Sequence, residues 1–223
     1  MSQSSQIIGT RLKRVDARGK TTGETRFLTD IQVANMVHGA PVYSSIPYGR
    51  LLGIDTTMVE SDSEFVAFFA ASDIPGENQV GVILEDQPLL ADQVVRYIGD
   101  SVGILIAKTP ESAQRLSKLV EVKTESFAPI LSIDESRDAQ DNFLHETNLA
   151  CQHQVKRGDP ESAFQEADHI IEARFETPFQ EHYYLEPQAC IAQVTSDGGV
   201  DILGSIQCPF YVQKAVSKAL AIP

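Results

Sequence analysis

The chain has 223 residues, of which 42% are hydrophobic and 22% are charged, and its formal net charge is −13. These values are ordinary for a globular protein, and the length allows one large or two small domains with a buried core. So acidic a surface repels phosphate backbones and anionic lipid headgroups, which argues against nucleic-acid and membrane binding. No window approaches the roughly 18 apolar residues of a membrane span.

The first residues are polar and lack the apolar core of a signal peptide, so we expect a cytoplasmic protein. We interpret residues 1–17 as a solvated arm or a partner-docking segment, because the chain's first 20 residues hold much of its positive charge. The three cysteines, Cys151, Cys190 and Cys208, are odd in number and form no CxxC pair. That spacing predicts neither a zinc site, nor an iron–sulfur cluster, nor a disulfide framework.

Residues 18–132 carry the pattern of a first domain. Apolar runs at 36–45, 64–70 and 103–107 predict strands, and residues 72–78 have the composition of a loop. Thr109 followed by Pro110 predicts a helix start, with Leu116, Leu119 and Val120 as the apolar stripe. The alternation over 120–124 predicts another strand, so 94–125 reads as a layered strand–helix–strand unit.

Residues 133–156 are polar and aperiodic, and we interpret them as a linker. In the second domain, 157–223, Asp159 before Pro160 predicts another helix start. Strands are expected at 168–177, 189–194 and 200–206. A closing helix is expected from Pro209, with an apolar face formed by Val212, Val216, Ala219 and Leu220. The predicted class is therefore α+β with mixed sheets.

None of the five histidines is spaced from another His or Cys as metal ligands are, and no hydrolase or nucleotide motif is present, so no metal-ligating or catalytic residue is assigned. Two polar stretches could carry chemistry. Residues 180–187 fit either a buried hydrogen-bond network or the wall of a cofactor cavity. Residues 205–210 lie where a strand is expected to lead into a helix. There Gln207 could hold a metal-bound oxygen or could bond to the helix start, and Cys208 fits a small buried residue better than a metal thiolate.

The motifs of the chain follow a recognisable order. They are Arg14-Val15-Asp16, Phe27-Leu28-Thr29-Asp30, Ser72-Asp73-Ile74-Pro75-Gly76, Gln87-Pro88-Leu89-Leu90-Ala91, Val95-Arg96-Tyr97-Ile98-Gly99-Asp100, Gly158-Asp159-Pro160-Glu161 and Gln180-Glu181-His182-Tyr183-Tyr184. In this order they resemble the molybdenum-cofactor-binding large subunit of the xanthine dehydrogenase and aldehyde oxidase family. Residues 18–132 are similar to its α/β hammerhead domain, and 157–223 to the start of its first molybdopterin-binding domain.

The resemblance implies an oxidoreductase that hydroxylates purines, aldehydes or N-heterocycles with oxygen from water. It implies a molybdenum–molybdopterin cofactor in the complete assembly, with iron–sulfur clusters and FAD on other domains or subunits as partners. Gln207 matches the family's molybdenum-proximal glutamine, although Ile206 stands where the family has threonine. We expect the remaining pterin contacts and the base glutamate beyond Pro223, so the isolated chain should be inactive. The alternatives are a non-catalytic scaffold subunit of the same fold and an unrelated small-molecule-binding α/β protein.

Overall fold

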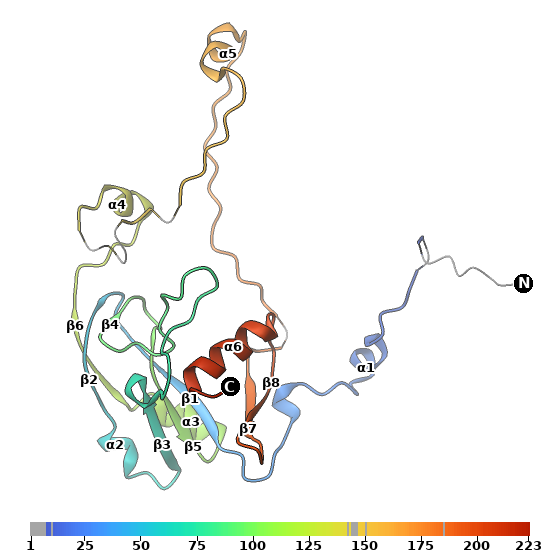
Figure 1. Cartoon of the computed structure of the whole chain (residues 1–223), viewed down its shortest axis with the longest axis vertical. Coiled ribbons are helices and arrows are strands. Elements are labelled where there is room, and N and C mark those ends of the chain that lie inside the picture. The colour runs from blue at the N-terminus through green and yellow to red at the C-terminus, as the bar shows by residue number, and fades with distance from the viewer. Residues whose placement is uncertain (1–7, 10, 142, 144–146, 150, 185) are drawn as a thin grey trace, which may run out of the picture. The chain divides into compact units, whose positions relative to one another are not determined.

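The protein is described from a computed structural model that covers residues 8–9, 11–141, 143, 147–149, 151–184 and 186–223. The chain divides into two compact units, Met1–Ser126 with Tyr184–Pro223, and Phe127–Tyr183. Helices and strands are both present, which confirms the α+β class (Figure 1). All the strands found among the described residues lie in the first unit.

Two three-stranded sheets and one hairpin make up the β structure of the first unit. The first sheet has the order β1 (His38–Tyr43), β5 (Ser101–Ala107), β3 (Phe65–Ala70), and the second has the order β4 (Val94–Val95), β2 (Gly49–Asp55), β6 (Glu121–Ser126). The hairpin joins β7 (Cys190–Val194) to β8 (Val200–Gly204). Every pairing between these strands is antiparallel, so the mixed sheets that we expected are replaced by antiparallel ones.

The helices are short and lie between, before and after the strands. In the first unit they are α1 (Ala17–Thr22), α2 (Thr57–Glu60), α3 (Pro110–Ser117) and α6 (Pro209–Leu220), with 3₁₀ turns at Leu28–Asp30 and Ala71–Asp73. The second unit holds α4 (Ile133–Asp138) and α5 (Pro160–Glu166). The predicted start of α5 is confirmed, because the Asp159 side chain accepts a hydrogen bond from the Ser162 amide at 3.3 Å.

The residues at the start of helix α3 determine where this helix begins. The Thr109 hydroxyl accepts a hydrogen bond from the Ser112 amide at 3.1 Å, and Pro110 occupies the first turn, as predicted. The helix ends at Ser117, so two residues of the expected apolar stripe, Leu119 and Val120, lie beyond its end. Leu116 is buried, but Leu119 follows the helix and is 43% exposed, so its assignment to the stripe was wrong.

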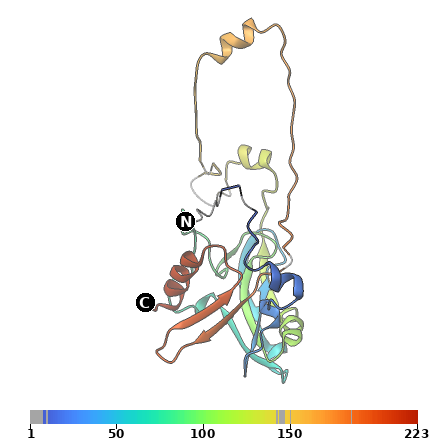
Figure 2. The same ribbon diagram turned by 90° about the vertical axis from the view of Figure 1, so that its right-hand side faces the viewer.

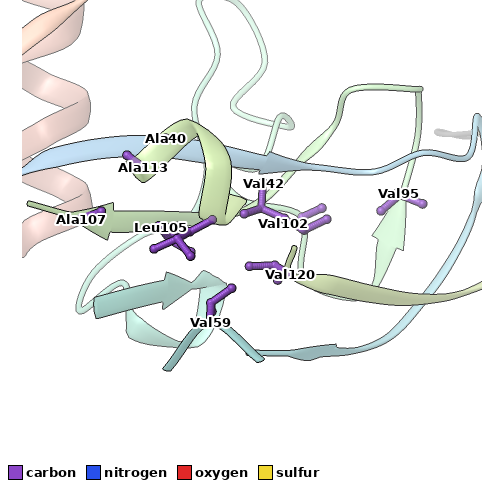
Figure 3. Packing of buried hydrophobic residues seen from close by; sticks show 11 residues of the cluster. Ala40, Val42, Val59, Val95, Val102, Leu105, Ala107, Ala113 and Val120 are labelled. Atoms are coloured by element: carbon purple, nitrogen blue, oxygen red, sulfur yellow. The ribbon is translucent and has the colours of Figure 1, made fainter. Parts of the chain in front are cut away.

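The core lies between the two sheets of the first unit and α3 (Figure 3). Its fully buried side chains include Leu105 on β5, Leu116 on α3, Val95 on β4 and Val59 on α2. Burying a leucine or valine side chain stabilises a fold by about 1.5–3 kcal/mol. The continuous apolar run of β5 follows from this position, because β5 is the central strand of its sheet.

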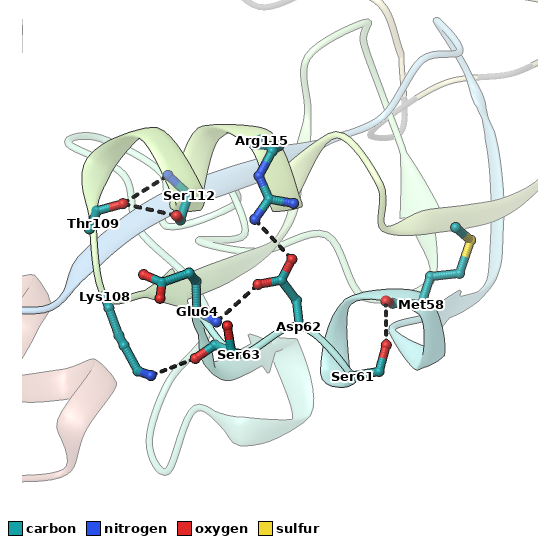
Figure 4. Close-up of polar contacts among 9 residues, drawn as sticks. All are labelled: Met58, Ser61, Asp62, Ser63, Glu64, Lys108, Thr109, Ser112 and Arg115. Carbon is teal, nitrogen blue, oxygen red and sulfur yellow. Dashed lines mark hydrogen bonds and ion pairs between the residues drawn. The ribbon is translucent and has the colours of Figure 1, made fainter.

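Polar contacts fix the turn between α2 and β3 (Figure 4). The Asp62 carboxylate accepts a hydrogen bond from the Glu64 amide and another from the Arg115 guanidinium, both at 2.9 Å. The Glu64 amide bond and, to a smaller extent, Arg115 hold the pKa of Asp62 below its ordinary value. This single carboxylate therefore ties the start of β3 to α3.

The structure corrects two expectations in the second unit. The stretch 133–156 is not wholly irregular, since α4 begins with a capping box in which Ser132 and Glu135 bond to each other's backbone amides at 3.1 Å. Residues 168–177 form no strand. Ile171 is 93% exposed and Phe175 is 89% exposed, and the described residues supply no strand beside them. An alternating sequence without a ladder partner has nothing to fix it as a strand.

Candidate functional site

The junction between β8 and α6 lies where the sequence predicted it. β8 ends at Gly204 and α6 begins at Pro209, which leaves residues 205–208 as the connection. The Ser205 amide bonds to the Ala189 carbonyl at 3.3 Å and so ties this connection to the start of the hairpin. Proline at the first position of α6 removes one amide that the helix could not satisfy itself.

Gln207 is exposed on this connection. Its side chain makes no hydrogen bond with any residue that the structure describes, so the alternative role of bonding to the helix start is not observed there. The carboxamide can donate and accept at once, which suits an oxygen ligand of a metal centre. That chemistry fits one contact to the molybdenum cofactor. Taken alone, it does not make up a cofactor site.

A groove of about 930 Å³ lies beside this connection, between the β7–β8 hairpin and α6. Figure 2 shows the helix running alongside the hairpin. Its apolar wall includes Ile206, Phe210, Val212 and Val216, and its polar wall includes Lys214. Gln207 is not among the lining residues, so the groove and the glutamine are separate features of the same junction.

The other predicted stretch, 180–187, does not form a buried network in its described part. Residues 180–184 have no regular structure and are exposed, and Leu185 lies outside the described residues. Tyr183 has a left-handed backbone with φ of 55°, and its side chain is 93% exposed. His182 and Tyr184 each have an interaction partner. The imidazole and phenols are therefore solvent-facing in the chain.

The cysteines are all free and exposed. The prediction that Cys208 is a buried apolar residue was therefore wrong, because the start of α6 lies at the surface, and Pro209 and Phe210 beside it are exposed too. No group of three or more His, Cys, Asp or Glu side chains within the described ranges could hold a metal ion. None of the helices in that part of the chain combines the length and apolar character that a membrane crossing needs.

Two family models account for nearly the whole chain. The model for "Aldehyde oxidase and xanthine dehydrogenase, a/b hammerhead domain" matches residues 22–140, more than half of the chain. This chain belongs to the aldehyde oxidase and xanthine dehydrogenase family. A second model, "Molybdopterin cofactor-binding domain", matches residues 142–223. The predicted resemblance and the order hammerhead domain, then molybdopterin-binding segment, are confirmed.

Curated members of the family resemble the chain along its whole length. Xanthine dehydrogenase 1 from Arabidopsis thaliana is 37% identical over 221 residues, which are 97% of this chain but 16% of that protein. The nicotinate dehydrogenase large molybdopterin subunit from Eubacterium barkeri is 27% identical and matches 100% of this chain and 53% of its own length. The chain thus spans a minor part of the first relative and about half of the second.

Solved structures of the family share the fold. The aldehyde oxidoreductase from Desulfovibrio gigas superposes with a TM-score of 0.85 over 94% of this chain and 25% of that one, at 22% identity. Quinoline 2-oxidoreductase from Pseudomonas putida 86 gives a TM-score of 0.84 over 96% of this chain and 29% of that one, at 21% identity. At these identities the likeness establishes the fold alone.

Proposed function

We propose that the chain is the N-terminal portion of the molybdenum-binding part of a hydroxylase that oxidises a purine, an aldehyde or an N-heterocycle with oxygen from water. The match of residues 142–223 to the molybdopterin cofactor-binding domain carries this proposal. The relatives named xanthine dehydrogenase, nicotinate dehydrogenase and aldehyde oxidoreductase support the range of substrates. When bound, the molybdenum cofactor supplies the two-electron oxidation.

Gln207 is the residue of this chain that we assign to the cofactor. Its exposed carboxamide, unbonded among the described residues, would contact an oxygen of the molybdenum centre from the β8–α6 connection. One amide and an open groove cannot hold a cofactor tightly, since a preorganised site needs all of its contacts at once. The isolated chain is therefore expected to be inactive and to need the remaining molybdopterin-binding part.

The partners in this proposal are those that the family resemblance implies. Iron–sulfur clusters and FAD would reside on other domains or subunits and would accept the electrons. The three cysteines of this chain are free and exposed. The proposed domain limits are an arm at 1–17, the hammerhead domain at 18–132, a linker at 133–156 and the partial molybdopterin-binding domain at 157–223.

The decisive experiment replaces Gln207 with alanine in the complete assembly. Loss of a hydrogen bond to a charged group costs about 1.5–3 kcal/mol, so turnover should fall about ten- to a hundredfold while the melting temperature and molybdenum content stay close to wild type. Gln193→Ala, at an exposed position on β7, is the matched control and should leave turnover unchanged. Unchanged turnover in the Gln207 variant would remove the residue from the site. An assembly that never contains molybdenum would favour the non-catalytic scaffold.

A further inference from the structure

The loop at residues 76–90 of the hammerhead segment is closed upon itself. The Asn78 side chain donates to the Leu90 carbonyl at 2.8 Å and accepts from the Leu90 amide at 3.0 Å. Two residues further in, the backbones of Val80 and Gln87 exchange hydrogen bonds of 2.7 and 3.1 Å. These paired bonds give the loop a defined shape. We call residues 76–90 the clamp loop.

The clamp loop holds the last turn of α6 through backbone bonds. The Gly76 amide donates to the Ala219 carbonyl at 2.9 Å, and the Glu77 amide donates to the Lys218 carbonyl at 3.0 Å. Carbonyls at a helix C-terminus lack partners inside the helix, so the Gly76 bond gives the Ala219 carbonyl a partner. The Lys218 carbonyl accepts a second bond from the Ala221 amide at 3.3 Å. A side chain at Gly76 would overlap the Lys218 carbonyl and lie 3.0 Å from that of Ala219, so glycine is required for the approach.

Charged side chains strengthen the same contact. The Lys218 ammonium lies between the carboxylates of Glu77 at 2.9 Å and Glu85 at 2.6 Å, and Lys214, one turn earlier, pairs with Glu85 at 3.3 Å. Lysines near a helix C-terminus also offset the negative end of its dipole. Each exposed pair alone contributes little, but here two carboxylates and two ammonium groups share one network beside the backbone bonds.

We infer that the clamp loop positions α6, and that Gly76, Glu77 and Glu85 are the positioning residues. Because α6 contains no fully buried residue, side-chain packing holds it only weakly. The loop lies in the segment matched as the hammerhead domain and α6 lies in the segment matched as the molybdopterin-binding domain, so the clamp joins the two. Since α6 starts just after Gln207, the clamp would also set where that amide lies. This last consequence rests on the proposed function, whereas the clamp itself does not.

The clamp depends on pH in a defined direction. The hydrogen bond from Lys218, with a further one from Lys214, lowers the pKa of Glu85 below its ordinary value of 4.5. A carboxylate with a lowered pKa stabilises the contact above pH 4.5 and loses that effect as the pH falls through its folded value. The bonds to Glu85 and Glu77 raise the pKa of Lys218 above 10.5, so its contribution is lost only as the pH rises through that higher value.

Amide hydrogen exchange of the full chain tests the clamp without any cofactor. Gly76→Ala should speed exchange at the Glu77 amide at least tenfold and leave the amide of Leu105 in the core protected. Gly53→Ala is the matched control, because a side chain there meets no atom within 4 Å. Unchanged protection of the Glu77 amide in Gly76→Ala would overturn the inference.

If Gly76→Ala fails to fold, substitutions of the charged side chains Lys218 and Glu85 test the inference instead. Lys218→Gln should speed exchange at the Glu77 amide severalfold at pH 7, and Lys218→Arg should restore protection because it keeps the charge. In the wild type the same amide should lose protection as the pH falls below 4.5, and Glu85→Gln should make that loss smaller. Glu24→Gln, an exposed carboxylate outside the network, is the control. Equal exchange in Lys218→Gln and Lys218→Arg would contradict the clamp and leave the proposed function untouched.

Discussion

Gly103 on β5 and Phe68 on β3 lie so close that no side chain fits at residue 103. A Cβ atom there would overlap the Phe68 ring and lie 2.8 Å from the Phe69 carbonyl oxygen. Gly103 pairs with Ala70 on one side and Val42 on the other, so the sheet cannot move away on either edge without breaking a ladder. The glycine is therefore a packing requirement of the first sheet.

We expect Gly103→Ala to lower the free energy of unfolding by about 1–3 kcal/mol, the usual range for overpacking a filled site. Urea unfolding followed by circular dichroism measures the change. Gly39→Ala is the control in the same sheet, because its new methyl group would meet only side-chain methyl groups, of Ile104 at 3.4 Å and of Ile106 at 3.3 Å. Similar urea midpoints for the two variants would show that the Phe68 ring moves aside without cost.

Substitution of Leu105 tests the position of the hydrophobic core. Leu105 is fully buried on the central strand, whereas Leu52 on β2 is 61% exposed. Leu105→Ala should destabilise the chain by about 2–5 kcal/mol through lost burial and the cavity left behind. Leu52→Ala should change stability by less than about 0.5 kcal/mol. The two midpoints of thermal unfolding give the comparison, and a larger loss for Leu52 would place the core elsewhere.

Asp55 at the end of β2 provides a titration test. Hydrogen bonds from Thr57, first from its side chain and then from its backbone, lower the Asp55 pKa from 3.8 to about 2, with Lys123 as a smaller cause. Its contribution to stability is therefore complete above pH 3.8 and disappears as the pH falls through about 2. NMR titration should show Thr57→Ala raising this pKa toward 3.8, and Lys123→Gln raising it as well. An unchanged pKa in Thr57→Ala would make the ion pair at 3.1 Å the principal cause.

Local signals explain which elements could be predicted from the sequence. Thr109 before Pro110 predicts α3, and the apolar runs predict the strands β1, β3 and β5, because each signal lies within a few residues. The run at 64–70 was expected to be buried, but no residue of β3 is buried. The capping box at Ser132 and Glu135 was also readable. The polar composition around it hid α4, since a six-residue helix needs no apolar stripe.

Contacts between distant residues explain the rest. The alternation at 168–177 indicates two faces of a segment, but it cannot supply a neighbouring strand. At the candidate site, the position of Gln207 between strand and helix followed from local pattern, whereas the exposure of Cys208 depends on what packs against α6. No local sequence pattern could predict the contact between the clamp loop and α6. Gly76 and Ala219 are far apart in the sequence and come into contact only in the folded chain.

The β7–β8 hairpin should be the least stable sheet of the first unit. None of its strand residues is fully buried, while four of the seven residues of β5 are. A two-stranded hairpin is marginally stable in water without a packed face, so it should open by local unfolding at low free energy.

Hydrogen exchange of the full chain should show amides of β7 and β8 exchanging at least a hundredfold faster than those of β5. Amides of the second sheet, β4–β2–β6, serve as the internal control and should exchange more slowly than the hairpin. Equal protection of the hairpin and β5 in a monomer would contradict this prediction. It would mean that contacts with α6 stabilise the hairpin as much as the core stabilises β5.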